Sequence, residues 1–318
     1  MQRARSGTSL TSFDFGPGRF VIHVSSLNKS FGARVAVDNV AFDVNAGESF
    51  GLLGPNGAGK TTTMHLLAGL LEPDGGEIEI AGASDPTRRA VRQNIGLAPQ
   101  ALALYEDLTA EQNVMFFGRL YGLGGAKLDQ HASWALDFVG LSERKRELVR
   151  TYSGGMARRL NLACALVHNP PVLLLDEPMA GVDPQSRNLL LENVRHLKTH
   201  GRTIVYSSHY LSEAESLCDR VAIMDEGRIL ALDTVDDLVA GYGGPSQVHV
   251  ELAGPLPDAC GPQPGAVNGR SWDFQSEDPL PYLAALSAKG ADFVSVRVEA
   301  PGLEAVFLNL TGRRPRDG

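Results

Sequence analysis

The sequence predicts an α/β fold whose core is a parallel β-sheet. Short and almost wholly apolar runs are typical of buried strands, and they lie at 49–53, 172–175 and 203–207. Helical patterns lie between them, at 62–71, 109–120 and about 185–200. Strands that alternate with helices in this way favour a parallel sheet covered by helices.

An antiparallel β subdomain and an α-helical subdomain are expected beside this core. From Phe20 the chain has β-like apolar residues, a polar turn region, and a second β-like stretch that reaches Val44. The segment 109–120 begins with a capping box formed by Thr109 and Gln112, and its apolar side chains lie on one helical face. The middle of the domain is therefore predicted to be helical.

The length of 318 residues is typical of one principal domain and a smaller one. Residues 1–19 carry arginines among Ser, Thr and Gly without the apolar stretch of a secretory signal, so we expect a disordered extension. The principal domain is expected at 20–240. After Gly241 the composition shifts to Gly and Pro, which marks a linker. A strand pattern at 293–298 and helical spacing at 303–310 then predict a small α+β accessory domain over 241–318.

The composition argues against several classes of protein. Lys and Arg total 29 against 37 Asp and Glu, a net charge of -8, which disfavours nucleic acid as the main partner. The three cysteines have no metal-ligand spacing, and an odd count argues against a disulfide framework, so a reducing cytoplasm fits best. No run approaches the roughly 20 apolar residues that span a bilayer. The chain is therefore not expected to cross a membrane itself.

The segment GPNGAGKT, Gly54–Thr61, has the pattern of a phosphate-binding loop between a strand and a helix. The glycines let backbone N–H groups face phosphate oxygens, Lys60 would reach the β and γ phosphates, and Thr61 would bind Mg²⁺. The alternative is a plain glycine-rich turn, since the four fixed positions match by chance in roughly one 300-residue chain in a hundred. The candidate nucleotide contacts in this stretch are Gly54, Pro55, Asn56, Gly57, Ala58, Gly59, Lys60, Thr61 and Thr62.

Two acidic residues, Asp176 and Glu177, follow the apolar run at 172–175. A carboxylate pair at the carboxyl end of a strand beside a phosphate loop predicts that Asp176 holds Mg²⁺ and that Glu177 polarises the attacking water. Two acids after a strand are more often just a solvated strand end. The phosphate loop upstream favours the functional interpretation.

The segment Ser153-Gly154-Gly155 lies immediately before an amphipathic helix expected at 158–167. A hydroxyl and free backbone N–H groups at a helix N-terminus form an anion site, although a simple helix cap has the same composition. The segment resembles the signature sequence of ATP-binding cassette (ABC) proteins. In that family the signature contacts the γ phosphate of a nucleotide held by a second copy.

The same resemblance implies roles for four more residues. Gln100, in GLAPQ, matches the family's Q-loop glutamine at Mg²⁺ and the water, and His209 matches the switch histidine. Asp183, in AGVDP, matches the D-loop aspartate at the dimer interface, and Phe31 the aromatic that stacks on adenine. Taken singly, each has an ordinary alternative as a loop amide, a strand-end histidine, a helix cap or a core residue.

Three positions depart from the family pattern, two in the signature and one at the adenine contact. Tyr152 and Met156 stand where the signature usually has Leu and Gln, and Phe31 lacks the hydroxyl of the more common Tyr. The Ser-Gly-Gly core is intact, so hydrolysis is not put in doubt. Stacking depends mainly on the ring face, so the missing hydroxyl should matter little.

Three segments resemble the branch of the family that serves ABC-2-type exporters. Their sequences are TYSGGMARRLNLACALVHNP, LLLDEPMAGVDPQSR and LEAVFLNLTG. The resemblance extends over nearly the whole chain from residue 20. It implies a P-loop NTPase core with a RecA-like sheet, Mg²⁺ with ATP as substrate, a homodimer and a separate ABC-2-type transmembrane permease. This chain would then lie at the cytoplasmic face of the membrane, held there by the permease.

Two other functions are considered. A soluble ABC ATPase that acts on ribosomes or DNA typically has two cassettes or a long coiled-coil insertion, whereas this chain has one cassette and a negative net charge. A non-enzymatic nucleotide-dependent scaffold would lack the acid at position 177. The transported molecule is not encoded here, because the permease selects it.

Overall fold

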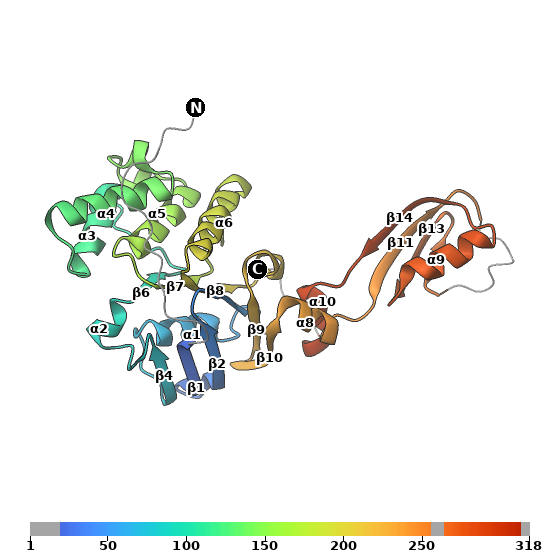
Figure 1. Ribbon diagram of the computed structural model, residues 1–318, viewed down its shortest axis with the longest axis horizontal. Coiled ribbons are helices and arrows are strands. Elements are labelled where there is room, and N and C mark those ends of the chain that lie inside the picture. Colours follow the sequence, from blue (N-terminus) through green and yellow to red (C-terminus); the bar gives the residue numbers. More distant parts are fainter. Residues whose placement is uncertain (1–19, 256–263, 313–318) are drawn as a thin grey trace. The chain divides into compact units, whose positions relative to one another are not determined.

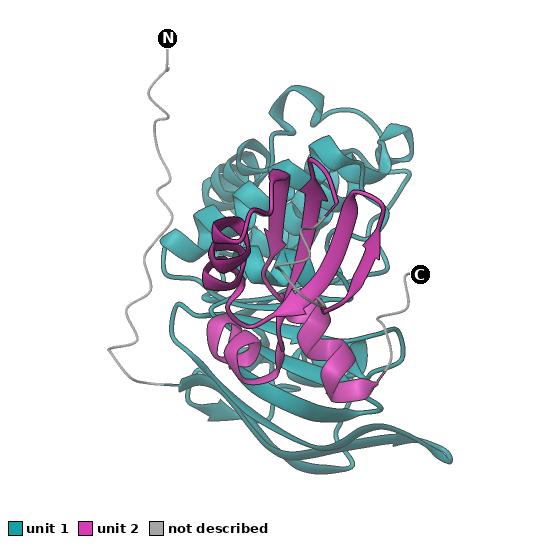
Figure 2. Ribbon diagram, turned by 90° about the vertical axis from the view of Figure 1, so that its right-hand side faces the viewer, with its two compact units in different colours: residues 1–233, 316–318 teal, residues 234–315 magenta. Residues whose placement is uncertain are grey.

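The computed structural model describes residues 20–255 and 264–312 (Figure 1). The expected N-terminal extension, residues 1–19, lies outside the described residues. The chain forms two compact units, the first ending at Asp233 and the second beginning at Thr234 (Figure 2). This division precedes the composition change at residue 241 because the helix α8 (Val235–Tyr242) belongs to the second unit.

The first unit is built on a six-stranded sheet with strand order β10-β9-β3-β8-β7-β6. Its strands are β3 (Ser49–Leu53), β6 (Ile95–Ala98), β7 (Val172–Asp176), β8 (Thr203–Ser208), β9 (Arg220–Asp225) and β10 (Arg228–Thr234). The strand β3 pairs in parallel with β8 and β9, and β7 pairs in parallel with β6 and β8. The three predicted buried strands and the parallel core are confirmed.

Helices follow strands of this sheet, as the alternating pattern predicted: α1 (Lys60–Leu67) follows β3, α6 (Pro184–Thr199) follows β7 and α7 (Leu211–Leu217) follows β8. The short helix α2 (Arg89–Arg92) instead precedes β6. The helix α1 differs from the predicted 62–71. It begins at Lys60, directly after the glycine loop, and ends before Gly69, whose φ of +65° turns the chain out of the helix.

A second sheet in this unit is antiparallel, with order β2-β1-β4-β5. Its strands are β1 (Phe20–Phe31), β2 (Arg34–Asn45), β4 (Gly75–Ile80) and β5 (Ala83–Ser84). Apolar residues such as Val24 and Val37 share one buried cluster with Phe50 and Leu52 of β3 and Met64 of α1. The α1 helix therefore joins the two sheets and fixes the loop that precedes it.

The helical subdomain contains α3 (Ala110–Leu120), α4 (Gly125–Phe138) and α5 (Gly154–Leu166), with short 3-10 turns at Ser142–Arg144 and Val149–Thr151. Figure 1 shows this group and the antiparallel strands on either side of the central sheet. The predicted capping box is confirmed, because Thr109 Oγ1 accepts from Gln112 N and Gln112 Oε1 accepts from Thr109 N. The α5 helix begins four residues before the predicted start at Arg158, because Ser153 caps it.

The second unit has a four-stranded antiparallel sheet with order β12-β13-β11-β14. Its elements are α8, β11 (Ser246–Leu252), β12 (Ala266–Asn268), β13 (Ser271–Ser276), α9 (Pro279–Ala288), β14 (Phe293–Glu299) and α10 (Leu303–Thr311). Trp272 and Phe274 of the sheet form a separate core with Leu283 and Leu286 of α9. Within the described residues, no helix has the length and apolar character needed to cross a membrane.

Candidate functional site

The phosphate-binding loop follows β3 and leads directly into α1. Its backbone needs glycine, as Gly54 shows: φ is +152°, and a Cβ there would lie 2.1 Å from the carbonyl oxygen of Met224. The first residue of the loop is thereby packed against β9, and the loop ends at the N-terminus of α1. Free N–H groups at a helix N-terminus provide an anion site.

Lys60, the first residue of α1, points back into this loop. Its Nζ lies 2.8 Å from the carbonyl oxygen of Gly54, 3.1 Å from that of Pro55 and 3.3 Å from Glu177 Oε1. Only 4% of the side chain is exposed. Burial lowers the pKa of Lys60, and the carboxylate of Glu177 opposes that shift. The ammonium is therefore held where phosphate oxygens would compete for it.

Asp176 ends β7 and is fully buried. Its Oδ1 accepts from Ser207 Oγ at 2.6 Å and from Thr61 Oγ1 at 3.3 Å. Its Oδ2 has no hydrogen-bond partner among the described residues, although it is buried. The free carboxylate oxygen of Asp176 and the nearby hydroxyl of Thr61 are hard oxygen ligands, the kind that Mg²⁺ prefers.

Glu177 follows Asp176 and is held in a left-handed conformation, with φ at +44°. Its backbone N–H donates to Ser207, which fixes it against the end of β8. Its Oε2 accepts from Gln100 Nε2 at 3.2 Å and lies 3.1 Å from His209 Nδ1, in contact but without hydrogen-bond alignment. Only 5% of the side chain is exposed.

Gln100, Glu177 and His209 come together because each follows a parallel strand of one sheet. They lie after β6, β7 and β8, whose carboxyl ends meet at the same edge. With Lys60, the glutamate thus has neighbours from three other segments. The structure brings together these four residues, each of which the sequence analysis placed at the reacting end of the nucleotide.

A pocket of about 500 Å³ opens in front of this cluster. It is lined by Phe31, Arg34, Ala36, Asn56, Gly57, Gly59, Lys60, Thr61, Thr62, Gln100 and Glu177. Phe31 is about half exposed at its rim. Arg34 was missed by the sequence analysis, although Phe31 and Arg34 are partners across the β1–β2 hairpin, so the cation could have been found from that turn.

The signature segment, Ser153–Gly155, does not line this pocket. Ser153 and Gly154 are exposed, and Ser153 Oγ accepts from Met156 N at 3.3 Å, so Ser153 is the N-cap of α5. Asp183 caps α6 in the same way, because its Oδ1 accepts from Ser186 N at 2.9 Å. Gly155 is buried against Ser186 and Asp183, so the signature segment and the D-loop aspartate lie together.

The two departures from the signature pattern have structural uses. The Tyr152 hydroxyl donates to the carbonyl oxygen of Arg144 at 2.8 Å. Met156 is buried, and its sulfur lies 3.6 Å from Arg144 Nη1. Both side chains therefore connect the start of α5 to the turn at Ser142–Arg144. They stabilise the fold there, a role that differs from phosphate contact.

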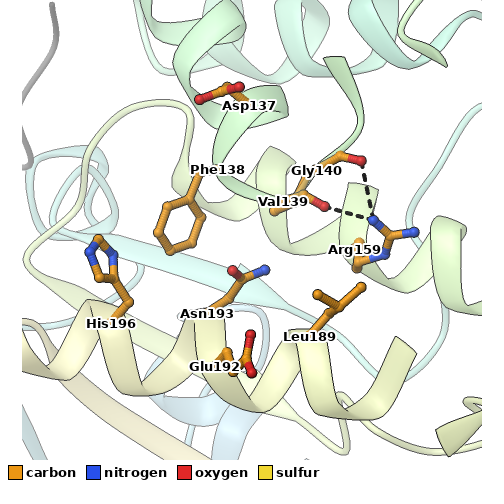
Figure 3. Close-up of a pocket in the computed structure, with 9 residues that line it drawn as sticks. All are labelled: Asp137, Phe138, Val139, Gly140, Arg159, Leu189, Glu192, Asn193 and His196. Atoms are coloured by element: carbon orange, nitrogen blue, oxygen red, sulfur yellow. Dashed lines mark hydrogen bonds between the residues drawn. The ribbon is translucent and has the colours of Figure 1, made fainter. Parts of the chain in front are cut away.

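A second pocket, of about 420 Å³, lies between the end of α4, α5 and α6 (Figure 3). It is lined by Asp137, Phe138, Val139, Gly140, Arg159, Leu189, Glu192, Asn193 and His196. Arg159 Nη1 donates to the carbonyl oxygens of Val139 and Gly140, at 2.8 and 3.3 Å, as the dashed lines in Figure 3 show. None of the predicted site residues lines it.

Comparisons with known proteins agree with this geometry. A family profile described as "ABC transporter" matches residues 37–180. The linearmycin resistance ATP-binding protein of Bacillus subtilis is 39% identical over 312 residues, which cover 93% of this chain and all of that protein. This chain belongs to the ABC transporter family. It is the ATP-binding subunit of a transporter, and it hydrolyses ATP to energise transport.

Other members of the ABC family are similar to most of this chain. The Nod factor export ATP-binding protein I of Sinorhizobium fredii is 38% identical, with 93% of this chain and 87% of that protein covered. A solved ATP-binding subunit of an ABC transporter is 33% identical, with a TM-score of 0.64 over 70% of this chain and 93% of that one. A dimeric ATP-binding cassette bound to ADP and phosphate has a TM-score of 0.62 at 24% identity and supports the fold alone. The P-loop core with its two subdomains is confirmed.

Proposed function

We propose that this ABC subunit acts as a homodimer that closes on two ATP molecules and drives a separate permease. Each nucleotide would lie between the loop Gly54–Thr62 of one copy and the signature segment of the other. The observation that carries the proposal is Glu177, buried at the end of the pocket with Lys60, Gln100 and His209 around its carboxylate. A carboxylate placed and oriented in this way is suited to polarise water for phosphoryl transfer.

The side chains around Glu177 would divide the work as follows. Lys60 binds the β and γ phosphates, and its move towards them frees Glu177 to accept a proton from water. Gln100 and His209 hold the Oε2 side of the carboxylate, so they orient Glu177 and the water it contacts. His209 is also placed to donate to a γ-phosphate oxygen, since it lies at the end of β8 beside the loop.

The residues at the end of β7 fit Mg²⁺. Thr61, Asp176 and Gln100 would hold it, with Asp176 Oδ2 as the buried oxygen that needs a partner. The described residues contain no group of three or more His, Cys, Asp or Glu able to hold a metal, so phosphate oxygens and water would supply the remaining ligands. When bound, Mg²⁺ would neutralise charge on the phosphates.

The open end of the pocket suits the nucleoside. Phe31 is 49% exposed and offers a ring face on which adenine would stack. Arg34 lines the same pocket, so positive charge is available near the triphosphate. These contacts support binding of ATP with the base outwards and the γ phosphate at Glu177.

The permease would contact the helical subdomain. Exposed apolar side chains there include Leu102, Tyr105 and Leu120, and Leu102 and Tyr105 follow Gln100 in the sequence. A surface of this kind, next to a residue that senses the nucleotide, is suited to pass dimer closure to a partner. The relatives that serve linearmycin resistance and Nod factor export support an ABC-2-type exporter, with this subunit at the cytoplasmic face of the membrane.

The test replaces the central carboxylate. Glu177→Gln keeps the shape of the side chain but removes the charge that accepts a proton, so we expect ATP turnover to fall at least 100-fold, on the order of one general base. ATP binding should persist, so an ATP-dependent dimer should accumulate in size-exclusion chromatography. Glu72→Gln, at an exposed position, is the matched control. A Glu177→Gln protein that turns over ATP at the wild-type rate would refute the proposal.

A further inference from the structure

Glu213 of α7 is a buried acidic residue that the proposed reaction does not use. Only 6% of its side chain is exposed. The hydroxyls of Tyr206 and Ser208 donate to its Oε2, at 2.6 and 3.0 Å. A buried carboxylate is costly unless it is bonded and paired, so its place in the molecule calls for a reason.

The other carboxylate oxygen faces α6. Glu213 Oε1 lies 3.4 Å from Arg187 Nε, at ion-pair distance but without the alignment of a hydrogen bond. Arg187 lies in the first turn of α6, where its backbone N–H donates to the carbonyl oxygen of Asp183 at 2.9 Å. The pair therefore links α7 to the turn that begins at the D-loop aspartate.

The residues around this pair also surround His209. The Ser208 hydroxyl donates to Glu213 and accepts from the backbone N–H of Tyr210 at 2.9 Å, so it fixes the chain on both sides of His209. The Arg187 guanidinium lies over the ring of Tyr210, 5.1 Å from its centroid. The ring centroids of Tyr210 and His209 are 4.0 Å apart.

From these contacts we infer that Glu213 is a positioning residue that couples the start of α6 to the switch histidine. The inference rests on the proposed function, in which His209 acts at the γ phosphate, and on the position at the dimer interface that the family resemblance implies for Asp183. Closure of the dimer presses on the first turn of α6. Arg187 and Glu213 pass that displacement to Ser208 and Tyr210, and so set the position of His209 against Glu177.

A purely structural role for Glu213 is the competing explanation, and it makes different predictions. Loss of a merely structural contact lowers stability, ATP binding and turnover together. Loss of a coupling contact lowers kcat but leaves the KM for ATP and the dimer unchanged, because only the orientation of His209 is affected. The variants must therefore separate these quantities.

Glu213→Gln is the first variant. The amide oxygen still accepts from Tyr206 and Ser208, but the charge that faces Arg187 is lost. Arg187→Met breaks the same pair from α6, and the double variant removes both charges and so leaves no buried ion alone. Arg187→Lys keeps the cation and is the conservative control.

We expect kcat of the full-length chain to fall about tenfold, or about 1.4 kcal/mol, in each single variant and no further in the double variant. The KM for ATP and the melting temperature of the double variant should stay close to wild type, and Arg187→Lys should keep most of kcat. Added to Glu177→Gln, the double change should leave the ATP-dependent dimer intact.

Wild-type kcat in the double variant would overturn the coupling, and so would a parallel loss of stability and dimer. A loss of kcat in the double variant that equals the sum, in free energy, of the losses in the two single variants would overturn it as well. Glu177→Gln, measured alongside, reports on the proposed function separately. If that variant alone retains turnover, the proposed function is wrong, whereas the effect of the pair is still measured in the wild-type background.

Discussion

Gly155 shows at the scale of one residue how closely the signature segment fits the start of α6. A Cβ on Gly155 would lie 2.2 Å from Ser186 Oγ and 2.9 Å from Asp183 Oδ2. Gly154, its neighbour, has only the carbonyl oxygen of Gly181 near the same position, at 3.8 Å. The second glycine of the segment is therefore required by contact within one copy of the chain, whatever a second copy does.

This difference predicts opposite outcomes for two alanine substitutions. Gly155→Ala should lower the free energy of unfolding by about 1–3 kcal/mol, because the added methyl must displace Ser186 or Asp183. Gly154→Ala should leave it within about 0.5 kcal/mol or raise it slightly, because alanine is the better helix former. Urea unfolding followed by circular dichroism measures both. Equal unfolding free energies for the two variants would contradict the packing described here.

At the scale of elements, a charged row crosses three strands of the antiparallel sheet. His23 of β1 lies between Asp43 of β2 and Glu79 of β4 in the register of the sheet. Its Nδ1 is hydrogen-bonded to Asp43 Oδ1. That bond, with the charges of Asp43, Glu79 and Glu77, raises the pKa of His23 above the ordinary 6.5.

The raised pKa sets the sign of a pH dependence. Protonated His23 binds its partners in the folded protein only, so its stabilising effect is full below pH 6.5 and is lost as pH rises through the folded pKa. We expect the NMR titration of His23 to have a midpoint above 6.5, and Asp43→Asn to lower that midpoint. The stability difference between wild type and Asp43→Asn should shrink from pH 6 to pH 8. A difference that grows over this range would contradict the assignment.

The elements that could be predicted from the sequence are those determined by residues that are close together in the chain. The run at 172–175 is apolar throughout, and the capping box at Thr109 is a local pairing, so both can be recognised from the sequence. The helix α9 and the strand β13 were not predicted. In β13 only Trp272 and Phe274 alternate with polar residues, which is too short a pattern to predict a strand within a region rich in Gly and Pro. The helix α9 begins with Pro279, a residue that is also typical of loops.

The candidate site was predictable to a similar extent. Motif order and resemblance identified Lys60, Gln100, Glu177 and His209, which the fold brings together. Arg34 was missed although its hairpin partner Phe31 was identified, whereas Glu213 was not identified because its role depends on Arg187, a neighbour that is distant in sequence. A buried carboxylate such as Glu213 has no sequence pattern that separates it from the exposed acid of an ordinary helix.

At the scale of the whole molecule, the two units have separate hydrophobic cores. The core of the second unit is centred on Trp272, which is fully buried and stacked on Phe274 with ring centroids 4.2 Å apart. Its Nε1 donates to the carbonyl oxygen of Pro264 at 2.8 Å. A unit of this size has a small margin of stability, so a single core residue matters greatly.

Trp272→Ala should therefore unfold the second unit alone. We expect a loss of about 3–5 kcal/mol, comparable to the whole stability of such a unit. The chain has two tryptophans, so the variant leaves Trp134 of α4 as the only one, and its fluorescence reports on the first unit. The unfolding midpoint of Trp134 and the affinity for ATP should match those of Trp272→Phe, a control that keeps an aromatic ring in the core and also has Trp134 as its only tryptophan. A shift of the Trp134 midpoint would show that the two cores are not independent.

The strand order of the central sheet also governs how the chain is made. The strand β3 leads into the phosphate-binding loop, yet its neighbours β8 and β9 come much later, and Ser49 and Asp219 are 170 residues apart in sequence. At about 5–20 residues per second, synthesis leaves β3 unpaired for roughly ten to thirty seconds. An apolar strand left open for that long is prone to aggregate, so it needs protection by chaperones or by early packing on α1. The nascent chain therefore gains its nucleotide site only when the first unit is almost fully synthesised.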